Sequence, residues 1–376
     1  MISSGSNTRE PSDASAEGGA DECLQRVRCR VTACDRVLKT FRFQTTDRVA
    51  MDVMEGYVSP ELVEHCAGRL GLQDEESVRR HFGIDLRWFY VPYVGPEGKQ
   101  LSQGHLLGTY SDNVTDRPLR GARTIADLDH YPWPDPLWWD AASITSFRDQ
   151  YPDHTVVIHC GWMPPFCTAC DAFGIEEALV SMIAAPQVFG AFVERQNEFY
   201  VELLRRACAQ AQGVADICCL GDDYAAQQTL MMSPESWRRF LKEPLRRQVE
   251  VAHRHGMFAL LHSCGAVREI LPDFIDIGVD VLLVFQTSAA GMDAESIARD
   301  FGGKIAFHGG IDCQQLLTYG SQEDVRQEVR RNIDLFSGCG GYIVANSHVI
   351  ENIKPENMVA MLQEAGTYTA ERRPSV

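Results

Sequence analysis

Two side chains that can bind a metal, His262 and Cys264, stand two positions apart in the segment His262-Ser263-Cys264-Gly265. On an extended segment, residues two apart face the same side, so the imidazole and the thiol can reach one point. An imidazole together with a thiolate is a favoured ligand pair for zinc. The spacing therefore indicates a zinc site, although it is also compatible with a buried thiol beside a histidine that caps a strand.

A second group with chemical capability is Asp222-Asp223-Tyr224, which follows an apolar run at residues 215–220. Adjacent residues of a strand face opposite ways, so only one of the two carboxylates can point into a site. That carboxylate could orient a substrate or accept a proton. The alternative is that one acid caps the following turn while the other is solvated.

The elements that must position these residues alternate along the chain. From about residue 36 onward, short aliphatic or β-branched runs alternate with longer segments of helical spacing, a pattern typical of a parallel α/β fold. Eight candidate strands can be counted, at residues 48–54, 86–91, 155–160, 215–220, 257–262, 279–285, 304–308 and 341–345.

Eight strand and helix units closed on themselves predict a single (β/α)8 barrel over residues 25–376. An open doubly wound sheet would give the same alternation, but no GxGxxG follows the first strand and no GxxxxGK[ST] segment occurs. Residues 1–24, rich in small and acidic side chains, are predicted to form a disordered tail. The irregular stretch 92–136 is predicted to be a long loop insertion after the second strand, lying over the barrel mouth.

One helix has readable ends near residues 233 to 256. Ser233 offers an N-cap, and Pro234 suits the first helical position. Gly256 is predicted to end the helix, while Pro244 should kink or split it.

Active sites of such barrels lie at the carboxyl ends of the strands, which decides the third zinc ligand. Cys339 precedes the last predicted strand and should lie at the opposite end of the barrel, whereas His348 follows that strand. We therefore predict that His262, Cys264 and His348 bind zinc and leave a fourth coordination position open, as in catalytic zinc sites. Other polar residues that follow predicted strands are Glu55, Gln286, His308 and Asn346.

The composition is that of an ordinary globular protein, with 45% hydrophobic and 23% charged residues in a chain of 376. Its 35 basic and 52 acidic residues give a net charge of −17, which repels phosphate backbones and anionic lipid headgroups. No apolar run approaches the roughly 18 to 20 residues of a membrane span, and the first residues lack the pattern of a signal peptide. We expect a cytoplasmic protein with no nucleic-acid or membrane partner and with its 13 cysteines reduced.

With these residues in view, the chain resembles the uroporphyrinogen decarboxylase superfamily, which also contains cobalamin-linked methyltransferases. The resemblance covers nearly everything after the tail. It rests on an early segment beginning at Arg36 and on Asp222-Asp223, HSCG from His262, HGGID from His308 and the closing GGYIVANSHVIENIKPENM at residues 340–358. It implies a single (β/α)8 barrel, in agreement with the strand count.

The resemblance also separates two branches. The decarboxylases carry an arginine-bearing segment of the form RQAGRY after the first strand, whereas the matching stretch here is Met54-Glu55-Gly56-Tyr57. An acid at this place would repel a porphyrinogen that carries many carboxylates. The methyltransferases hold zinc with an HxC pair and a later cysteine. His262 and Cys264 match the pair, and His348 takes the later position, which departs from the thiol methyltransferases and makes the site less anionic.

The resemblance to the methyltransferase branch implies the transfer of a methyl group between a corrinoid, bound to a carrier protein, and a small thiol or folate acceptor that zinc activates. Asp223 and His348 would be catalytic. Residues that would bind the substrate are Glu55, Asp222, Tyr224, Gln286, His308 and Asn346. A homodimer is a further expectation. The alternatives are a decarboxylase of a tetrapyrrole or aromatic acid, in which His348 and Asp223 handle the proton, and a barrel that binds a corrinoid or porphyrin without turnover.

Overall fold

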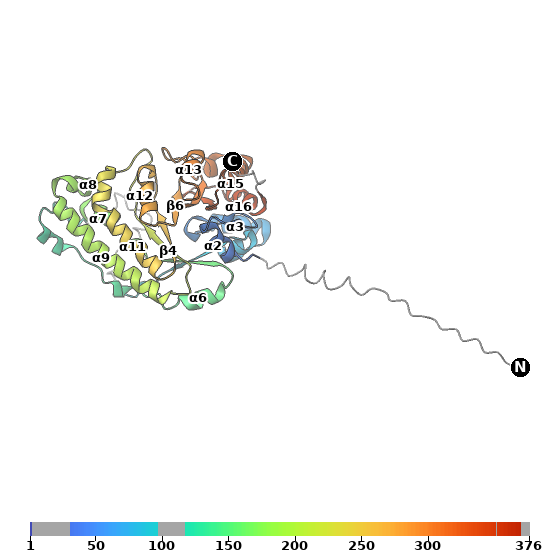
Figure 1. Ribbon diagram of the computed structural model, residues 1–376, viewed down its shortest axis with the longest axis horizontal. Coiled ribbons are helices and arrows are strands. Elements are labelled where there is room, and N and C mark those ends of the chain that lie inside the picture. Colours follow the sequence, from blue (N-terminus) through green and yellow to red (C-terminus); the bar gives the residue numbers. More distant parts are fainter. Residues whose placement is uncertain (2–30, 97–116, 351, 370–376) are drawn as a thin grey trace.

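The computed structural model describes residues 31–96, 117–350 and 352–369, together with Met1. Within them, eight parallel strands and the helices between them form a nearly closed (β/α)8 barrel, which confirms the predicted fold (Figure 1). The predicted tail at residues 1–24 lies outside the described residues, apart from Met1. So does the middle of the insertion at residues 92–136.

Each of the eight predicted strands overlaps an observed one. The strands are β1 (Ala50–Met51), β2 (Leu86–Tyr90), β3 (Thr155–His159), β4 (Ile217–Gly221), β5 (Phe258–His262), β6 (Val281–Phe285), β7 (Ala306–Ile311) and β8 (Tyr342–Asn346). They pair in the order β1-β8-β7-β6-β5-β4-β3-β2, so β1 and β2 are the two ends of the sheet. Most are buried along their whole length, which is why they read as nearly continuous apolar runs.

The helices surround the strands. They are α2 (Ala33–Phe41), α3 (Pro60–Leu70), α4 (Glu75–Phe82), α6 (Ile144–Gln150), α7 (Pro165–Phe173), α8 (Ile175–Ala184), α9 (Pro186–Gln210), α10 (Pro234–Phe240), α11 (Lys242–Arg254), α12 (Leu271–Asp276), α13 (Ala294–Phe301), α14 (Leu316–Tyr319), α15 (Gln322–Phe336) and α16 (Pro355–Thr367), with short 3-10 turns η1 (Met54–Gly56), η2 (Ile125–His130), η3 (Pro136–Trp138) and η4 (Arg268–Ile270). Among the described helices, no single one is long and apolar enough to cross a membrane. The bent pair of α8 and α9 meets that test of length and composition only when the two are taken together.

The predicted helix ends near residues 233 to 256 are confirmed. The Ser233 hydroxyl accepts a hydrogen bond of 3.1 Å from the backbone N–H of Ser236 at the start of α10. The helical pattern is split, as predicted: α10 ends at Phe240 and α11 begins at Lys242, which places Pro244 in the first turn of a new helix, where its missing N–H costs little. Gly256 adopts a positive φ of 75° just after α11 ends.

Alternation along the strands separates two apolar cores. The inner core fills the barrel, and residues from all eight strands contribute to it: Ala50, Leu86, Trp88, Val157, Ile217, Cys219, Leu260, Val281, Leu283, Ala306 and Ile343. The outer core lies between the strands and the helices, and fully buried aromatic side chains such as Trp237, Phe189 and Phe307 belong to it.

A polar layer follows the inner core at the carboxyl ends of alternate strands. The inner core contains Ala50 of β1, Val157 of β3, Leu260 of β5 and Ala306 of β7. Two positions further along each chain segment, the inward positions hold Asp52, His159, His262 and His308, and all four are buried. Strand alternation therefore gathers one carboxylate and three imidazoles inside this end of the barrel.

Asp85 connects β1 and β2, the two end strands of the sheet, which are not joined by a strand ladder. Its carboxylate accepts hydrogen bonds from Arg36 of α2 (2.6 Å), from both terminal nitrogens of Arg48 (2.9 and 3.0 Å) and from the backbone N–H of Met51 in β1 (2.9 Å). The backbone N–H of Asp85 donates to the Met51 carbonyl at 3.0 Å. One fully buried carboxylate thus joins α2, β1 and the start of β2.

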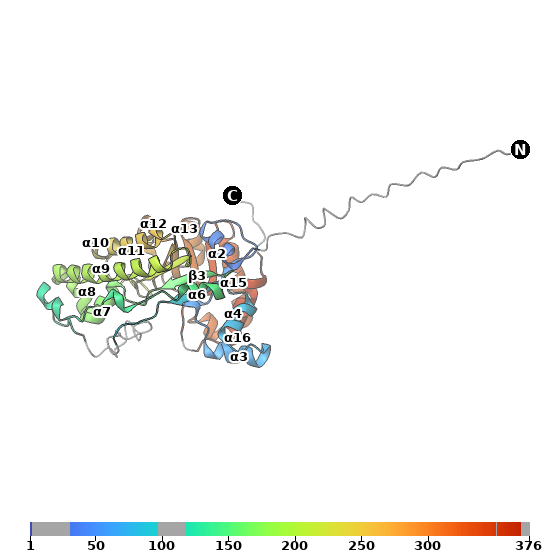
Figure 2. The ribbon, with the colours of Figure 1, turned by 90° about the horizontal axis from the view of Figure 1, so that it is seen from below.

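The described parts of the insertion after β2 pack on helices of the barrel wall. Tyr93 forms an antiparallel bridge with Trp139, and the Trp133 ring lies 5.3 Å from that of Phe192 in α9. In Figure 2, α7, α8 and α9 lie together at one end of the molecule, while α3, α4 and α16 pack together at the other. Residues 97–116 lie outside the described part of the chain, so the predicted cover over the barrel mouth stays a prediction.

Candidate metal centre

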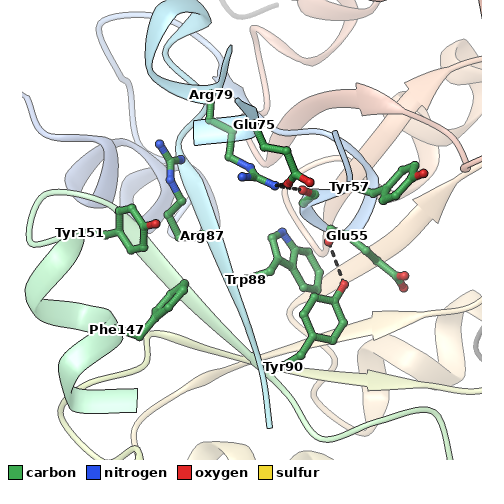
Figure 3. A pocket seen from close by; sticks show the side chains of 10 residues that line it. Glu55, Tyr57, Glu75, Arg79, Arg87, Trp88, Tyr90, Phe147 and Tyr151 are labelled. Atoms are coloured by element: carbon green, nitrogen blue, oxygen red, sulfur yellow. Dashed lines mark hydrogen bonds and ion pairs between the residues drawn. The ribbon is translucent and has the colours of Figure 1, made fainter. Parts of the chain in front are cut away.

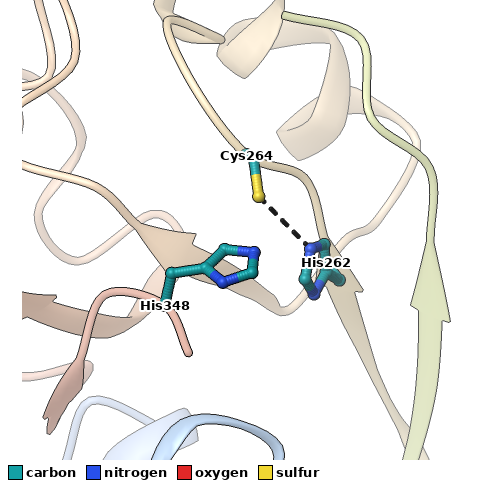
Figure 4. A group of neighbouring side chains, drawn as sticks. All are labelled: His262, Cys264 and His348. Atoms are coloured by element: carbon teal, nitrogen blue, oxygen red, sulfur yellow. Dashed lines mark hydrogen bonds between the residues drawn. The ribbon is translucent and has the colours of Figure 1, made fainter. Parts of the chain in front are cut away.

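The three side chains predicted as zinc ligands lie together. His262 ends β5, Cys264 follows it by two residues, and His348 follows β8, so the cluster joins two strands from different parts of the barrel (Figure 4). One ligand atom from each residue lies within 4.8 Å of the other two, and Cys264 Sγ is 3.4 Å from His262 Nε2. No other group of three such residues was found among the described residues.

Hydrogen bonds orient both histidines so that the same ring nitrogen can bind a metal. His262 Nδ1 lies 2.7 Å from Glu55 Oε1, and His348 Nδ1 lies 2.9 Å from the Val349 carbonyl. Both partners are acceptors, so each neutral ring carries its proton on Nδ1 and keeps the lone pair on Nε2. Carboxylates and backbone carbonyls in this position are the usual outer partners of metal-binding histidines.

The spacing fits zinc. With Zn–S of about 2.3 Å and Zn–N of about 2.0 to 2.1 Å, a tetrahedral ion separates a sulfur from a nitrogen ligand by about 3.5 Å. The separation between Cys264 Sγ and His262 Nε2, 3.4 Å, agrees with that value. Two imidazoles and a thiol are also the donor types that zinc prefers.

The electrostatics of the cluster favour a cation. Burial raises the pKa of the Cys264 thiol well above its usual value, and the nearby Asp223 carboxylate raises it further. Burial alone would raise the pKa of Glu55, but the adjacent His262 ring outweighs it and lowers that pKa to about 2. A half-buried thiol flanked by Glu55 and Asp223 gains most from a bound dication, because the cation stabilises the thiolate.

A family model described as uroporphyrinogen decarboxylase (URO-D) matches residues 112–368, more than half of the chain. The protein belongs to the uroporphyrinogen decarboxylase family. This confirms the resemblance that the motifs indicate.

Two solved structures are similar to this chain. A methyltransferase from Methanosarcina mazei has a TM-score of 0.61 at 17% identity, covering 89% of this chain and 98% of that one, and this likeness shows a shared fold. An L-ribulose 3-epimerase gives a TM-score of 0.43 at 14% identity, covering 85% of this chain and 91% of that one. No curated protein matches the chain.

In this member of the family, three further predicted residues hold the segments that carry the cluster of His262, Cys264 and His348. The Asp223 carboxylate accepts the Cys264 backbone N–H at 2.8 Å, and Gln286 Oε1 accepts the Gly265 N–H at 3.0 Å. The Asn346 side chain accepts the Met54 N–H at 3.0 Å and donates to the His348 carbonyl at 2.8 Å. Direct contact of these three residues with a substrate stays a prediction.

Asp222 and Tyr224 contact the helices around the barrel, and their predicted contact with an acceptor stays a prediction. Both Asp222 carboxylate oxygens accept backbone N–H groups at the start of α7, and burial raises the pKa of Asp222 to about 7. The Tyr224 ring packs against Trp237 and Phe274 in the outer core. Alternation is the reason: β4 turns Cys219 inward, so Asp223 follows it inward while its two neighbours face the helices.

His308 lies inside the barrel rather than at its surface. It is fully buried, and its Nε2 is 3.1 Å from Asp52 Oδ2, which also accepts the Trp88 indole N–H at 2.9 Å. The predicted contact of His308 with a substrate stays a prediction, and the contacts observed tie β7 to β1 and β2.

Two contacts at the site were not predicted. The Trp162 and His262 rings pack in a T-shaped arrangement with centroids 4.7 Å apart. The Glu55 carboxylate is the hydrogen-bond partner of the His262 ring. Gly221 makes the first contact feasible, because a Cβ there would lie 2.2 Å from the Trp162 ring. The presence of Gly221 at the end of a strand is the sequence signal for a close approach of this kind.

Glu55→Gln is expected to lower zinc affinity about 10- to 100-fold, because the amide polarises the His262 ring less than the carboxylate does. Competition with a chromophoric chelator would measure the change. Glu61→Gln, on the first turn of α3, is a control that should leave the affinity unchanged. Equal zinc affinity in Glu55→Gln and the unaltered protein would contradict the role assigned to this contact.

Proposed function

We propose that the protein is a zinc-dependent methyltransferase that moves a methyl group between a corrinoid on a carrier protein and a small thiol or folate acceptor. The observation that carries the proposal is the cluster of His262, Cys264 and His348 at the carboxyl end of the barrel. Membership of the uroporphyrinogen decarboxylase family and the similarity to a methyltransferase fold support it.

Zinc bound by these three residues would supply a Lewis acid that favours the thiolate form of an acceptor. The chain's own residues prepare the site. The Glu55 carboxylate accepts a hydrogen bond from the Nδ1–H of His262 and so fixes the direction of Nε2. Asp223 holds the Cys264 backbone at a fixed distance from His262. Trp162 covers one side of the His262 ring and excludes water there.

Glu55 argues against a polycarboxylate substrate. Its partly buried carboxylate lies in the segment where the resemblance places arginines of the decarboxylases, and the adjacent His262 lowers its pKa to about 2, so it is charged at neutral pH. A substrate carboxylate brought next to it at the metal cluster would be repelled. An acceptor whose reacting end carries no carboxylate meets no such obstacle.

A decarboxylase is the second candidate, favoured by one observation. Asp223 Oδ1 lies 3.8 Å from His262 Nε2, an acid and base pair that could handle a proton without a metal. This candidate predicts full turnover of its substrate after complete removal of metal.

Metal content and methyl transfer test the proposal together. Protein purified without an affinity tag is expected to hold about one zinc ion per chain and to demethylate methylcobalamin with a thiol such as 2-mercaptoethanol. Chelation and the variant Cys264→Ala should each remove both properties. Cys339→Ala should remove neither, because that half-buried thiol bonds to the Phe336 carbonyl at the other end of the barrel. A protein without zinc after reconstitution, or with activity unaltered in Cys264→Ala, would contradict the proposal.

A further inference from the structure

A cavity of about 350 Å³ opens in the side of the barrel, beside η1 and β2 (Figure 3). This is where the sheet has its two ends, so no strand ladder closes the wall there. The volume falls in the range of about 300 to 1,000 Å³ that is typical of small-molecule sites. The cavity is separate from the metal cluster. Glu55 lines the cavity, but its carboxylate is bound to His262 of the cluster and is turned away from Arg79 (Figure 3).

Five of the ten residues that line the cavity are aromatic. Trp88 and Tyr90 of β2 stack with centroids 6.4 Å apart and planes inclined by 25°, and Tyr90 is 45% exposed. Phe147 and Tyr151, from α6 and the residue after it, line the cavity as well. Gly56 leaves room for the indole, because a Cβ there would lie 2.5 Å from Trp88 Cδ1 and the residue has a positive φ of 71°.

Two arginines line the cavity, and they differ in their free donors. Arg87 is buried, and its nitrogens are bound to Glu76 and to the carbonyls of Ile84 and Leu86. Arg79 uses only Nη2, which donates to the Gly56 carbonyl at 2.7 Å and to Glu75 at 2.6 Å.

Arg79 is therefore the group that can receive an anion. Its Nε and Nη1 donors have no partner among the described residues. When Glu75 turns away, one N–H of Nη2 is freed beside one of them, and that pair forms the fork that matches a carboxylate. Glu75, its partner, has a side chain that is 55% exposed, so it can turn into solvent when another anion arrives.

We propose that this cavity is a binding site for a small planar aromatic carboxylate. The ring lies among the Trp88, Tyr90 and Phe147 side chains, and the carboxylate binds Arg79 in place of Glu75. The aromatic side chains can stack on the ring of the ligand, and the Arg79 guanidinium can form charge-assisted hydrogen bonds with its carboxylate. Of the two lining arginines, Arg79 alone has nitrogens without a partner among the described residues, so the cavity favours a ligand with one carboxylate over a ligand with several. The site does not depend on the proposed methyl transfer.

The occupant would also contact the segment that holds the metal cluster. Arg79 binds the Gly56 carbonyl, and the Tyr90 hydroxyl donates to the Glu55 carbonyl at 2.8 Å. Glu55 in turn binds His262. A ligand on Arg79 and Tyr90 therefore touches the two side chains that hydrogen-bond to the backbone carbonyls of Gly56 and Glu55.

The test is calorimetric binding of benzoate and of its neutral analogue benzamide to the full chain. Benzoate is expected to bind at least tenfold more tightly than benzamide, and Arg79→Gln should weaken benzoate by about 10- to 100-fold, as for loss of a hydrogen bond to a charged group. Glu75→Gln should tighten benzoate about two- to fivefold, because it removes a competing surface anion. Neither substitution should alter the binding of benzamide.

Two controls separate this site from the metal centre and from general effects of charge. Cys264→Ala should bind benzoate as the unaltered protein does, whatever happens to its zinc. Arg205→Gln, which removes an exposed arginine from a pair with Glu202 in α9, should also leave benzoate binding unchanged. The proposal is overturned if benzoate does not bind, if benzamide binds equally well, or if Glu75→Gln leaves benzoate affinity unchanged. The Glu75 substitution lies on the surface and keeps the test valid if Arg79→Gln fails to fold.

Discussion

His348→Ala is expected to lower zinc affinity by about two to three orders of magnitude. Structural zinc sites bind with about 10 to 16 kcal/mol, and this amount shared over four positions is about 2.5 to 4 kcal/mol for each ligand. His348→Cys should retain most of the affinity, because a thiolate is an equally suitable ligand and the methyltransferases that the chain resembles use a cysteine as the third ligand.

The measurement is a zinc titration of the three proteins against a competing chelator. His255→Ala is the matched control: His255 is also partly buried and its Nδ1 also lies 2.8 Å from a backbone carbonyl, that of Val251, but it is remote from the cluster at the end of α11. If His348→Ala binds zinc as tightly as His255→Ala, the third ligand is another residue and the cluster must be reassigned.

Much of the barrel could be predicted from the sequence because of how it is buried. Strands such as Val281–Phe285 face the inner core on one side and the helices on the other, so they read as unbroken apolar runs between helical segments. Short strands show the limit of this signal. Only Ala50–Met51 of the predicted run at residues 48–54 forms a ladder, because the chain turns into η1 directly afterwards.

The proximity of His262, Cys264 and His348 could be predicted because it rests on local geometry. His262 and Cys264 share a face through their spacing, and His348 was chosen over Cys339 by the direction of one strand. Asp222 and Asp223 show what local geometry leaves open. Alternation requires them to face opposite ways, but which one faces inward depends on the register of β4 in the barrel, which single-sequence reasoning does not fix.

The partner of His262 could not be predicted, because it comes from the other side of the fold. Glu55 and His262 are 207 residues apart in the sequence. They are in contact because η1 directs the Glu55 side chain across the mouth of the barrel. The predicted contact of Glu55 with a substrate stays a prediction, and the structure adds its hydrogen bond to His262, one of the three clustered side chains. The side cavity had no sequence signal either, since it arises where two strands do not pair.

Asp85→Ala is expected to destabilise the fold by about 3 to 5 kcal/mol, because it leaves the Arg48 guanidinium without a carboxylate partner and Arg36 with Asp47 alone. Asp85 is fully buried, and the Arg36 and Arg48 side chains that bind it are 8% and 17% exposed. The same substitution removes the acceptor of the Met51 N–H in β1. All of these contacts lie where β1 and β2 lack a ladder, so no strand pairing compensates for their loss.

Calorimetry of both proteins measures this effect. At an unfolding entropy of about 2.1 cal/mol/K per residue, the loss corresponds to a fall of about 4 to 6 °C in the melting temperature of a chain of this length. Glu202→Ala is the control, since Glu202 and Arg205 are exposed and such surface pairs contribute less than about 1 kcal/mol, or roughly 1 °C here. A melting temperature in Asp85→Ala no lower than in Glu202→Ala would mean that the meeting point of β1 and β2 is held by the apolar cores rather than by this carboxylate.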